Sequence, residues 1–290
     1  MASPFPTCYL NGEYLPIGEA RVSPLDRGFL FGDGVYEVMP VYGGRPFRLE
    51  AHCARLTRSL AELRMSDPLS KDQWREIFSS LIARGGGGDQ YLYWQVTRGA
   101  ELGRNHAPLP QVPRTVFAFS CPLPATSAAV LEKGLACVTA ADTRWARCDI
   151  KSTALLANVL LRQLAVDAAA AETILLRDGQ LTDASASAVH AVIAGELRTP
   201  PNSREILPST TRAVVEELAT RIGIPWRAAP VSESQLRGAE EIWISAATRE
   251  VQPVTSLDGR PVGAGRPGAL WSRVYGEFQR WKRELQGKPW

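Results

Sequence analysis

The chain has 290 residues, which is enough for one large domain or for two domains of ordinary size. Hydrophobic residues make up 45% of it and charged residues 22%, values that argue against disorder, collagen-like repeats and a disulfide scaffold. The net charge of +3 is spread along the chain, which gives no reason to expect nucleic acid or an acidic membrane surface as a partner. Of the 33 basic residues only five are lysines, so the position of each lysine matters.

Cysteine usage and the N-terminus point to a cytoplasmic protein. The five cysteines contain no CxxC motif, and together with three scattered histidines they form no zinc-ligand pattern. We therefore expect reduced, mostly buried thiols and no metal. The N-terminus lacks the basic and apolar regions of a signal peptide, and no apolar run approaches the roughly 20 residues that cross a bilayer.

The first third of the chain is predicted to hold two hairpins and two helices. Asn11-Gly12 between short apolar runs indicates the first hairpin. The alternating residues 35–41 and the pair Gly43-Gly44 indicate the second hairpin, whose return begins at Phe47. Apolar residues at helical spacing then predict helices over 50–64 and around 74–82. Two apolar runs predict buried strands over 91–97 and 115–120.

A short proline-rich segment, residues 121–127, is the best candidate for a linker. Beyond it we expect strands at 135–140, 173–176, 188–193 and 241–245, and helices at 153–170, 211–222 and 269–286. Strands in hairpins with inserted helices predict an α+β protein with domains at 1–120 and 128–290. No GxGxxG or GxxxxGK[ST] motif opens a helix, so the usual dinucleotide and P-loop fingerprints are missing.

Lys151 is the first residue that could carry chemistry. It precedes a predicted helix that Ser152 or Thr153 would cap, and apolar residues such as Leu155 and Leu156 stand behind it. Partial desolvation would lower the pKa of its amine and free it as a nucleophile. From position alone a solvent-exposed lysine is the commoner case, so the surrounding motifs decide between the two.

Five motifs in chain order resemble the fold-type IV pyridoxal phosphate enzymes, the class IV aminotransferases. They are Asp26–Val38, Glu50–Leu56, Lys151–Leu160 with Glu172–Ser187, Leu207–Arg212 and Trp243–Glu250. The resemblance runs from about residue 9 to 260. It implies the two-domain fold of the D-amino acid and branched-chain aminotransferases, with pyridoxal 5′-phosphate between the domains and Lys151 in the C-terminal one.

The same resemblance assigns most of the cofactor-binding residues. Lys151 would hold the cofactor as a Schiff base and later move a proton between the substrate Cα and the cofactor C4′. Arg55 would bind the phosphate through its guanidinium. Thr210 and Thr211 would do so at the start of a helix, where free N–H groups favour an anion. Leu207 would pack against the cofactor ring.

Asp183 stands where the family has a glutamate that faces the pyridine nitrogen. Aspartate is one methylene shorter, so the pair with the ring nitrogen needs a closer approach or a bridging water. Alanine at positions 186, 188 and 247 also removes hydroxyl or amide groups that the family often has there. The remaining hydroxyl candidates near the cofactor are Ser185, Ser187, Ser245 and Thr248.

The segment Arg98–His106 resembles the substrate loop of D-amino acid transaminases. In that family an Arg-x-His pair and a tyrosine bind the substrate carboxylate, and the matching residues are Arg104, His106 and Tyr36. A guanidinium and an imidazole two residues apart can hold one carboxylate from one side. The family's loop enters the neighbouring subunit's active site, so the resemblance implies a homodimer. Glu101 on this segment receives no role.

These assignments lead to a D-amino acid transaminase. It would move the amino group from D-alanine-like substrates to a 2-oxo acid such as 2-oxoglutarate by a ping-pong reaction. The Arg104-x-His106 pair favours this activity over a branched-chain L-amino acid transaminase, because that family lacks the pair. An aminodeoxychorismate lyase or an (R)-amine transaminase of the same fold is a further alternative. Intact Lys151 and Arg55 argue against a non-catalytic homologue.

Overall fold

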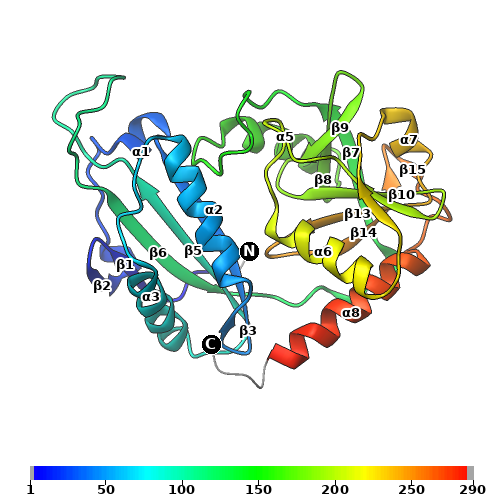
Figure 1. The fold of residues 1–290 in the computed structure, drawn as a ribbon, viewed down its shortest axis with the longest axis horizontal. Coiled ribbons are helices and arrows are strands. Elements are labelled where there is room, and N and C mark those ends of the chain that lie inside the picture. Colours follow the sequence, from blue (N-terminus) through cyan, green and yellow to red (C-terminus); the bar gives the residue numbers. More distant parts are fainter. Residues whose placement is uncertain (1–2, 286–290) are drawn as a thin grey trace. The chain divides into compact units, whose positions relative to one another are not determined.

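The computed structural model describes residues 3–285, and the chain divides into two compact units (Figure 1). The described part of the first unit contains residues 3–124, Ile150–Leu155 and Leu285, and the second contains Ala125–Asp149 and Leu156–Glu284. The first long stretch thus ends inside the segment predicted as a linker. Lys151 was expected in the C-terminal domain, but the contacts of residues Ile150–Leu155 group it with the first unit.

The first unit is built on a six-stranded antiparallel sheet in the order β2-β1-β6-β5-β3-β4. Its strands are β1 (Thr7–Leu10), β2 (Glu13–Pro16), β3 (Gly34–Tyr42), β4 (Arg45–Pro46), β5 (Gln90–Thr97) and β6 (Thr115–Pro122). Its helices are η1 (Ile17–Glu19), α1 (Arg27–Phe31), α2 (Leu49–Glu62) and α3 (Lys71–Arg84). Both predicted hairpins are confirmed, because β1 pairs with β2 and β3 pairs with β4, but the return strand of the second is Arg45–Pro46 and does not begin at Phe47.

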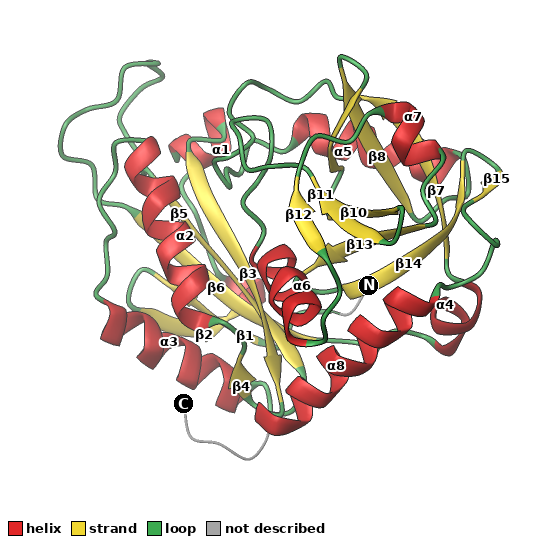
Figure 2. Ribbon diagram, turned by 45° about the vertical axis from the view of Figure 1, so that its right-hand side comes forward, coloured by secondary structure: helices red, strands yellow, loops and turns green. Residues whose placement is uncertain are grey.

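Helices α2 and α3 and the sheet enclose the core of the first unit (Figure 2). Trp74 and Phe78 of α3 lie 6.3 and 4.7 Å from the ring of Trp94 on β5, measured between ring centroids. Leu56 and Leu60 of α2 are buried in the same cluster. Large aromatic side chains at this spacing bury much apolar area, which holds α2 and α3 against the strands.

The second unit is built on a nine-stranded mixed sheet, in which β15 pairs with β14 beside the main path β12-β11-β10-β13-β14-β7-β8-β9. Its strands are β7 (Leu135–Ala141), β8 (Glu172–Arg177), β9 (Gln180–Ala184), β10 (Ala188–Ile193), β11 (Glu196–Thr199), β12 (Trp226–Ala228), β13 (Glu241–Ala246), β14 (Glu250–Leu257) and β15 (Arg260–Pro261). Its helices are α4 (Ala128–Lys133), α5 (Leu156–Asp167), α6 (Thr210–Arg221), α7 (Glu233–Arg237) and α8 (Ala269–Leu285). Helices and sheets in both units confirm the α+β prediction.

The helix that follows Lys151 starts later than predicted, so the prediction that Ser152 or Thr153 caps it is wrong. Helix α5 begins at Leu156. Ser152 instead forms a β-bridge with Val35, and Oγ1 of Thr153 donates to the carbonyl oxygens of Gly32 and Gly34 at 3.2 and 3.3 Å. Pairing with the start of β3 therefore takes up the residues that the local pattern assigned to a helix.

The apolar face of α5 is exposed, which contradicts the expectation that it desolvates the lysine. The exposed fractions of Leu156, Val159 and Leu160 are 73%, 60% and 61%. Helical periodicity identifies an apolar face, but it does not say whether the same chain covers that face.

The strand β14 was not predicted, because Pro253 interrupts an otherwise strand-like run. The five cysteines are free and buried, as the sequence indicated. Within residues 3–285 we find no helix with the length and apolar character that crossing a bilayer requires.

Candidate active site

Lys151 is attached to β3 of the first unit through its backbone. Its carbonyl oxygen accepts a hydrogen bond from the N–H of Tyr36 at 3.0 Å, and its own N–H donates to Oγ of Ser59 at 3.3 Å. Its Nζ lies 4.1 Å from the centroid of the Tyr36 ring, a distance at which an aromatic face attracts a cation. The structure therefore brings two predicted site residues together, with the amine over the tyrosine ring.

Arg55 is buried on α2 and is paired with Glu37, the neighbour of Tyr36 on β3. Nε and Nη2 of Arg55 donate to the two carboxylate oxygens of Glu37 at 2.7 and 2.8 Å. Nδ1 of His52 lies 2.8 Å from the same carboxylate. Burial alone would raise the pKa of Glu37, but Arg55 and His52 lower it to about 2. This ionised carboxylate fixes Arg55 in place, and neither Glu37 nor His52 was assigned a role from the sequence.

Arg104 and His106 lie against one aromatic ring of the first unit. Cζ of Arg104 is 5.0 Å from the centroid of Phe31, and the His106 ring is 5.4 Å from it. Both residues are exposed and belong to a segment without regular structure. The structure therefore brings these two predicted residues together. Among the residues it describes, no hydrogen bond or ring contact joins Tyr36 to either, so the tyrosine's place in a carboxylate site stays a prediction.

Asp183 is buried at the end of β9 in the second unit. The backbone N–H groups of Ala184 and Leu207 favour its ionised form, and Nη1 of Arg144 lies 3.3 Å from its Oδ2. Burial raises the pKa of Asp183 to about 6, although Arg144 and the two N–H groups act in the opposite direction. Leu207 and Asp183 are thus neighbours, and the sequence missed Arg144.

Arg144 is bound more tightly to Asp142 than to Asp183. Its Nε and Nη2 donate to the two carboxylate oxygens of Asp142, each at 2.9 Å. Oγ1 of Thr182 donates to the same carboxylate at 2.8 Å. Burial acts to raise the pKa of Asp142, but Arg144 and Thr182 hold it below its usual range. Asp142 therefore binds the guanidinium of Arg144 through two hydrogen bonds, whereas Asp183 has one longer contact with it. Arg144 lies in an irregular segment, where no sequence pattern marks it.

The serines that were candidates for cofactor binding have protein partners. Hydroxyls of Ser185 and Ser187 donate to the buried carboxylate of Glu172, and Oγ of Ser245 lies 2.9 Å from Nε2 of the buried His190. Ser185 and Ser187 therefore already donate their single hydroxyl proton, whereas the direction of the Ser245–His190 hydrogen bond depends on the tautomer of the histidine.

Thr210 and Thr211 begin helix α6, as the sequence indicated. Ser209 is the N-cap and accepts a hydrogen bond from the N–H of Arg212 at 3.1 Å. The first turn of a helix carries N–H groups without partners inside the helix and the positive end of the dipole, and both favour a phosphate.

The donor groups of the two units fit pyridoxal phosphate by their chemistry. The first unit has a lysine amine, which can attach to an aldehyde, and a buried arginine. The second has the start of α6 and a buried carboxylate whose raised pKa makes a cationic partner, such as a protonated pyridine nitrogen, strongly favourable. Whether these groups act on one cofactor stays a prediction.

The family model and two related sequences that match this chain are those of aminotransferases. Residues 34–257 match the model of the family Amino-transferase class IV. The chain is 39% identical to a D-alanine aminotransferase of Bacillus licheniformis over 277 residues, which cover 93% of this chain and 94% of the relative. Identity to a D-alanine aminotransferase of Listeria monocytogenes is 36% over 271 residues, 93% of each protein.

Comparison with solved structures confirms the predicted fold-type IV architecture. The branched-chain amino acid aminotransferase of Escherichia coli has a TM-score of 0.91 and 25% identity, with 100% of this chain and 98% of that chain covered. The T.th. branched-chain amino acid aminotransferase with pyridoxamine 5′-phosphate has a TM-score of 0.90 and 25% identity, with 99% and 97% covered. By sequence and by fold, the chain belongs to the class IV aminotransferases, enzymes that use pyridoxal 5′-phosphate as their cofactor.

Proposed function

We infer that the chain is a D-amino acid transaminase that moves the amino group from D-alanine-like substrates to 2-oxo acids such as 2-oxoglutarate. The observation that carries this inference is that Arg104 and His106 both lie against the ring of Phe31, at 5.0 and 5.4 Å from its centroid, which keeps a guanidinium and an imidazole near each other on one loop. The D-alanine aminotransferases among its relatives support the same activity.

Each proposed role follows from the chemistry of a side chain. When bound, pyridoxal phosphate supplies an electron sink for the substrate Cα. Lys151 anchors the cofactor and then carries a proton to and from the substrate Cα. Asp183 keeps the pyridine nitrogen protonated, and Leu207 packs beside the ring. Arg55 binds the phosphate, and its hydrogen bond to Glu37 fixes the position of its guanidinium.

Further cofactor roles remain part of the proposal. Thr210 and Thr211 offer N–H and hydroxyl groups to the phosphate at the start of α6. Ser185 and Ser245 stay candidates with weaker support, because Glu172 and His190 already occupy their hydroxyls.

The half-reaction with a single amino acid tests this function. We expect D-alanine alone to convert the purified holoenzyme to its pyridoxamine form, seen as loss of the visible cofactor absorbance, and L-leucine to leave the spectrum unchanged. Conversion by L-leucine or L-glutamate without conversion by D-alanine would establish an L-amino acid transaminase instead. Release of pyruvate from aminodeoxychorismate, with no response to D-alanine, would establish a lyase.

A branched-chain activity is the second candidate, because the solved structures reported above are branched-chain aminotransferases. They share the fold at 25% identity, whereas the D-alanine aminotransferases share 36–39% identity over most of this chain. The L-leucine arm of the same experiment decides between the two.

We also propose that the working unit is a homodimer. The apolar face of α5, made by Leu156, Val159, Leu160 and Leu164, is exposed along the whole helix. A continuous apolar stripe of this kind marks an interaction surface, and the resemblance of Arg98–His106 to a loop that enters a neighbouring subunit supports a second copy of the chain as its partner. The cytoplasmic location is a further proposal, supported by the five buried free thiols.

Leu160→Glu should weaken this dimer by at least about a hundredfold in dissociation constant, because the contact would bury an unpaired carboxylate. Analytical ultracentrifugation measures the change. Val22→Glu is the matched control, since Val22 is an exposed apolar residue that does not belong to α5. A monomeric wild type, or an unchanged dimer in the Leu160→Glu protein, would contradict the proposed surface.

A further inference from the structure

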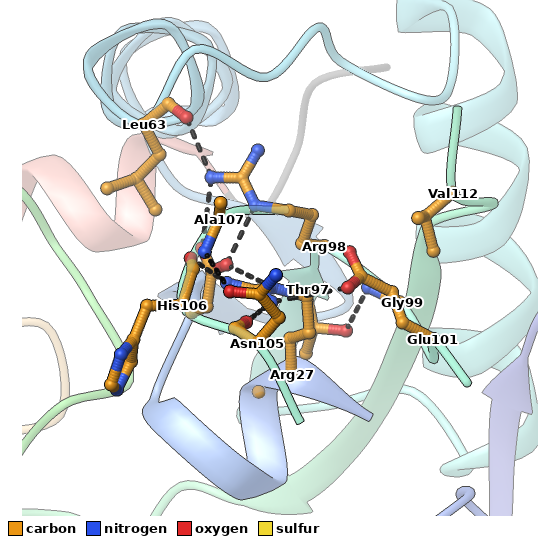
Figure 3. Close-up of polar contacts among 12 residues, drawn as sticks. Arg27, Leu63, Thr97, Arg98, Gly99, Glu101, Asn105, His106, Ala107 and Val112 are labelled. Atoms are coloured by element: carbon orange, nitrogen blue, oxygen red, sulfur yellow. Dashed lines mark hydrogen bonds and ion pairs between the residues drawn. The ribbon is translucent and has the colours of Figure 1, made fainter. Parts of the chain in front are cut away.

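Arg27 is a buried arginine that joins helix α1 to the segment carrying Arg104 and His106 (Figure 3). Its Nη1 donates to the carbonyl oxygen of Asn105 at 2.6 Å, and its Nη2 donates to the carbonyl oxygen of His106 at 2.9 Å. The same guanidinium is paired with two carboxylates, those of Asp33 at 2.9 Å and Glu101 at 3.4 Å. One rigid planar group therefore binds consecutive carbonyls of the proposed substrate loop.

The helix that carries Arg27 is firmly fixed at its start. The buried carboxylate of Asp26 accepts the N–H of Gly28 at 2.8 Å and the hydroxyls of Thr97 and Thr115 at 3.0 and 2.6 Å. The N–H of Arg27 donates to the carbonyl of Gly99 at 2.9 Å. The end of β5 and the start of β6, which flank the loop, are thus tied to the residue before Arg27.

The two strands of chain at the base of the loop pack closely against each other, and contacts between them fix the base. Gly99 has a φ of +97°, and a Cβ atom there would collide with the carbonyl oxygen of Pro113. Glu101, which pairs with Arg27, accepts the N–H of Leu109 at 2.9 Å. The loop therefore closes on itself at its base, and Arg27 supports it between these two points.

Phe31 supplies the surface under the two substrate residues. The guanidinium carbons of Arg27 and Arg104 lie 4.8 and 5.0 Å from its centroid, and the His106 ring lies 5.4 Å from it. In Figure 3 the His106 imidazole extends away from the polar cluster, while its backbone stays within that cluster. The main chain is thus held, and the side chain is left available.

We propose that Arg27 is a positioning residue for the substrate carboxylate. By holding the carbonyls of Asn105 and His106, it sets the orientation from which Arg104 and His106 bind together. This inference rests on the proposed D-amino acid transaminase function. Its physical basis is that a shift of about 1 Å in a binding group can cost up to about a hundredfold in efficiency.

Arg27→Lys tests the proposal, because lysine keeps the charge beside Asp33 and Glu101 but cannot donate to two carbonyls in one plane. We expect KM for D-alanine to rise by about tenfold or more with kcat changed by less than about threefold. Hydrogen exchange of the amides of residues 104–107 and 109 should also become faster, and this measurement needs neither substrate nor cofactor.

Arg98→Lys is the matched control. Arg98 donates to the same carboxylate of Asp33 at 2.7 and 3.1 Å and to the carbonyl of Leu63 at 2.8 Å, whereas the carbonyls of Asn105 and His106 accept from Arg27. Its KM for D-alanine and its loop exchange should match the wild type within about twofold. Equal effects of the two substitutions would reduce Arg27 to a structural role and overturn the proposal.

A second variant covers the case in which Arg27→Lys does not fold. Phe31→Leu removes the aromatic surface but keeps every hydrogen bond of Arg27, and it should raise KM for D-alanine severalfold. Wild-type KM and exchange in the folded variants would refute the inference. A wild type that is inert towards D-alanine would instead refute the proposed function, while hydrogen exchange would still test whether Arg27 holds the loop.

Discussion

Replacing Lys151 by alanine should lower the rate of the D-alanine half-reaction by at least about a thousandfold, because the variant loses the amine that carries the proton at the substrate Cα. Stopped-flow absorbance in single turnover measures this rate directly. The variant should still fold, since the backbone bonds of Lys151 to Tyr36 and Ser59 do not involve its side chain.

Lys133→Ala is the matched control for Lys151, because Lys133 is an exposed lysine in the last turn of α4. It should retain the wild-type rate. A Lys151→Ala protein with an unchanged melting temperature and a rate within tenfold of wild type would show that another group moves the proton. Added small amines should restore part of the lost rate if the missing group is the amine itself.

Local sequence patterns correctly predicted hairpins and helices in which the interacting residues lie close together in the sequence. The hairpin at Asn11-Gly12 and the helix over 50–64 follow from turn chemistry and period, and the structure has β1, β2 and α2 there. The region after Lys151 shows where such rules fail. Ser152 pairs with Val35, more than a hundred residues earlier, and no local pattern contains that strand.

The missed site residues are charged groups whose partners are distant in sequence or lie in irregular segments. Arg27 contacts residues 74 to 79 positions further along the chain, and Glu37 binds Arg55, 18 positions after it. Arg144 lies in a loop without periodicity. A family resemblance located Arg55 and Asp183, but it did not supply the neighbouring charges that set their electrostatics.

The apolar face of α5 shows a different limit. A stripe of leucine and valine at helical spacing predicts burial, yet Leu156 and Leu160 are exposed in the single chain. The pattern is the same whether one chain or two copies cover the face. The structure shows that the described part of the same chain does not cover this face, which is the observation behind the proposed dimer contact.

Replacing Asp183 by asparagine should lower turnover by about ten- to a hundredfold and leave cofactor binding largely intact. The neutral amide cannot keep the pyridine nitrogen protonated, and a hydrogen bond to a charged group contributes about 1.5–3 kcal/mol. Steady-state kcat and cofactor absorbance measure the two effects separately. Unchanged turnover would mean that another group protonates the ring.

The same substitution should stabilise the cofactor-free protein at neutral pH. Burial raises the pKa of Asp183 from the ordinary value of 3.8 to about 6, so the folded state binds the proton more tightly than the unfolded state does. Ionisation therefore costs stability as pH rises from about 4 to above 6, by up to about 3 kcal/mol. The gain from Asp183→Asn should appear above pH 6 and vanish below pH 4.

Denaturant unfolding of the cofactor-free protein at pH 4, 6 and 8 tests this pH dependence. Asp178→Asn is the matched control, because it makes the same change at an exposed aspartate in the turn before β9. Equal stability of wild type and Asp183→Asn at pH 8 would show that Arg144 compensates the buried charge fully. A gain in stability together with a loss in turnover would show that the protein keeps an unfavourable buried carboxylate because the cofactor ring needs it.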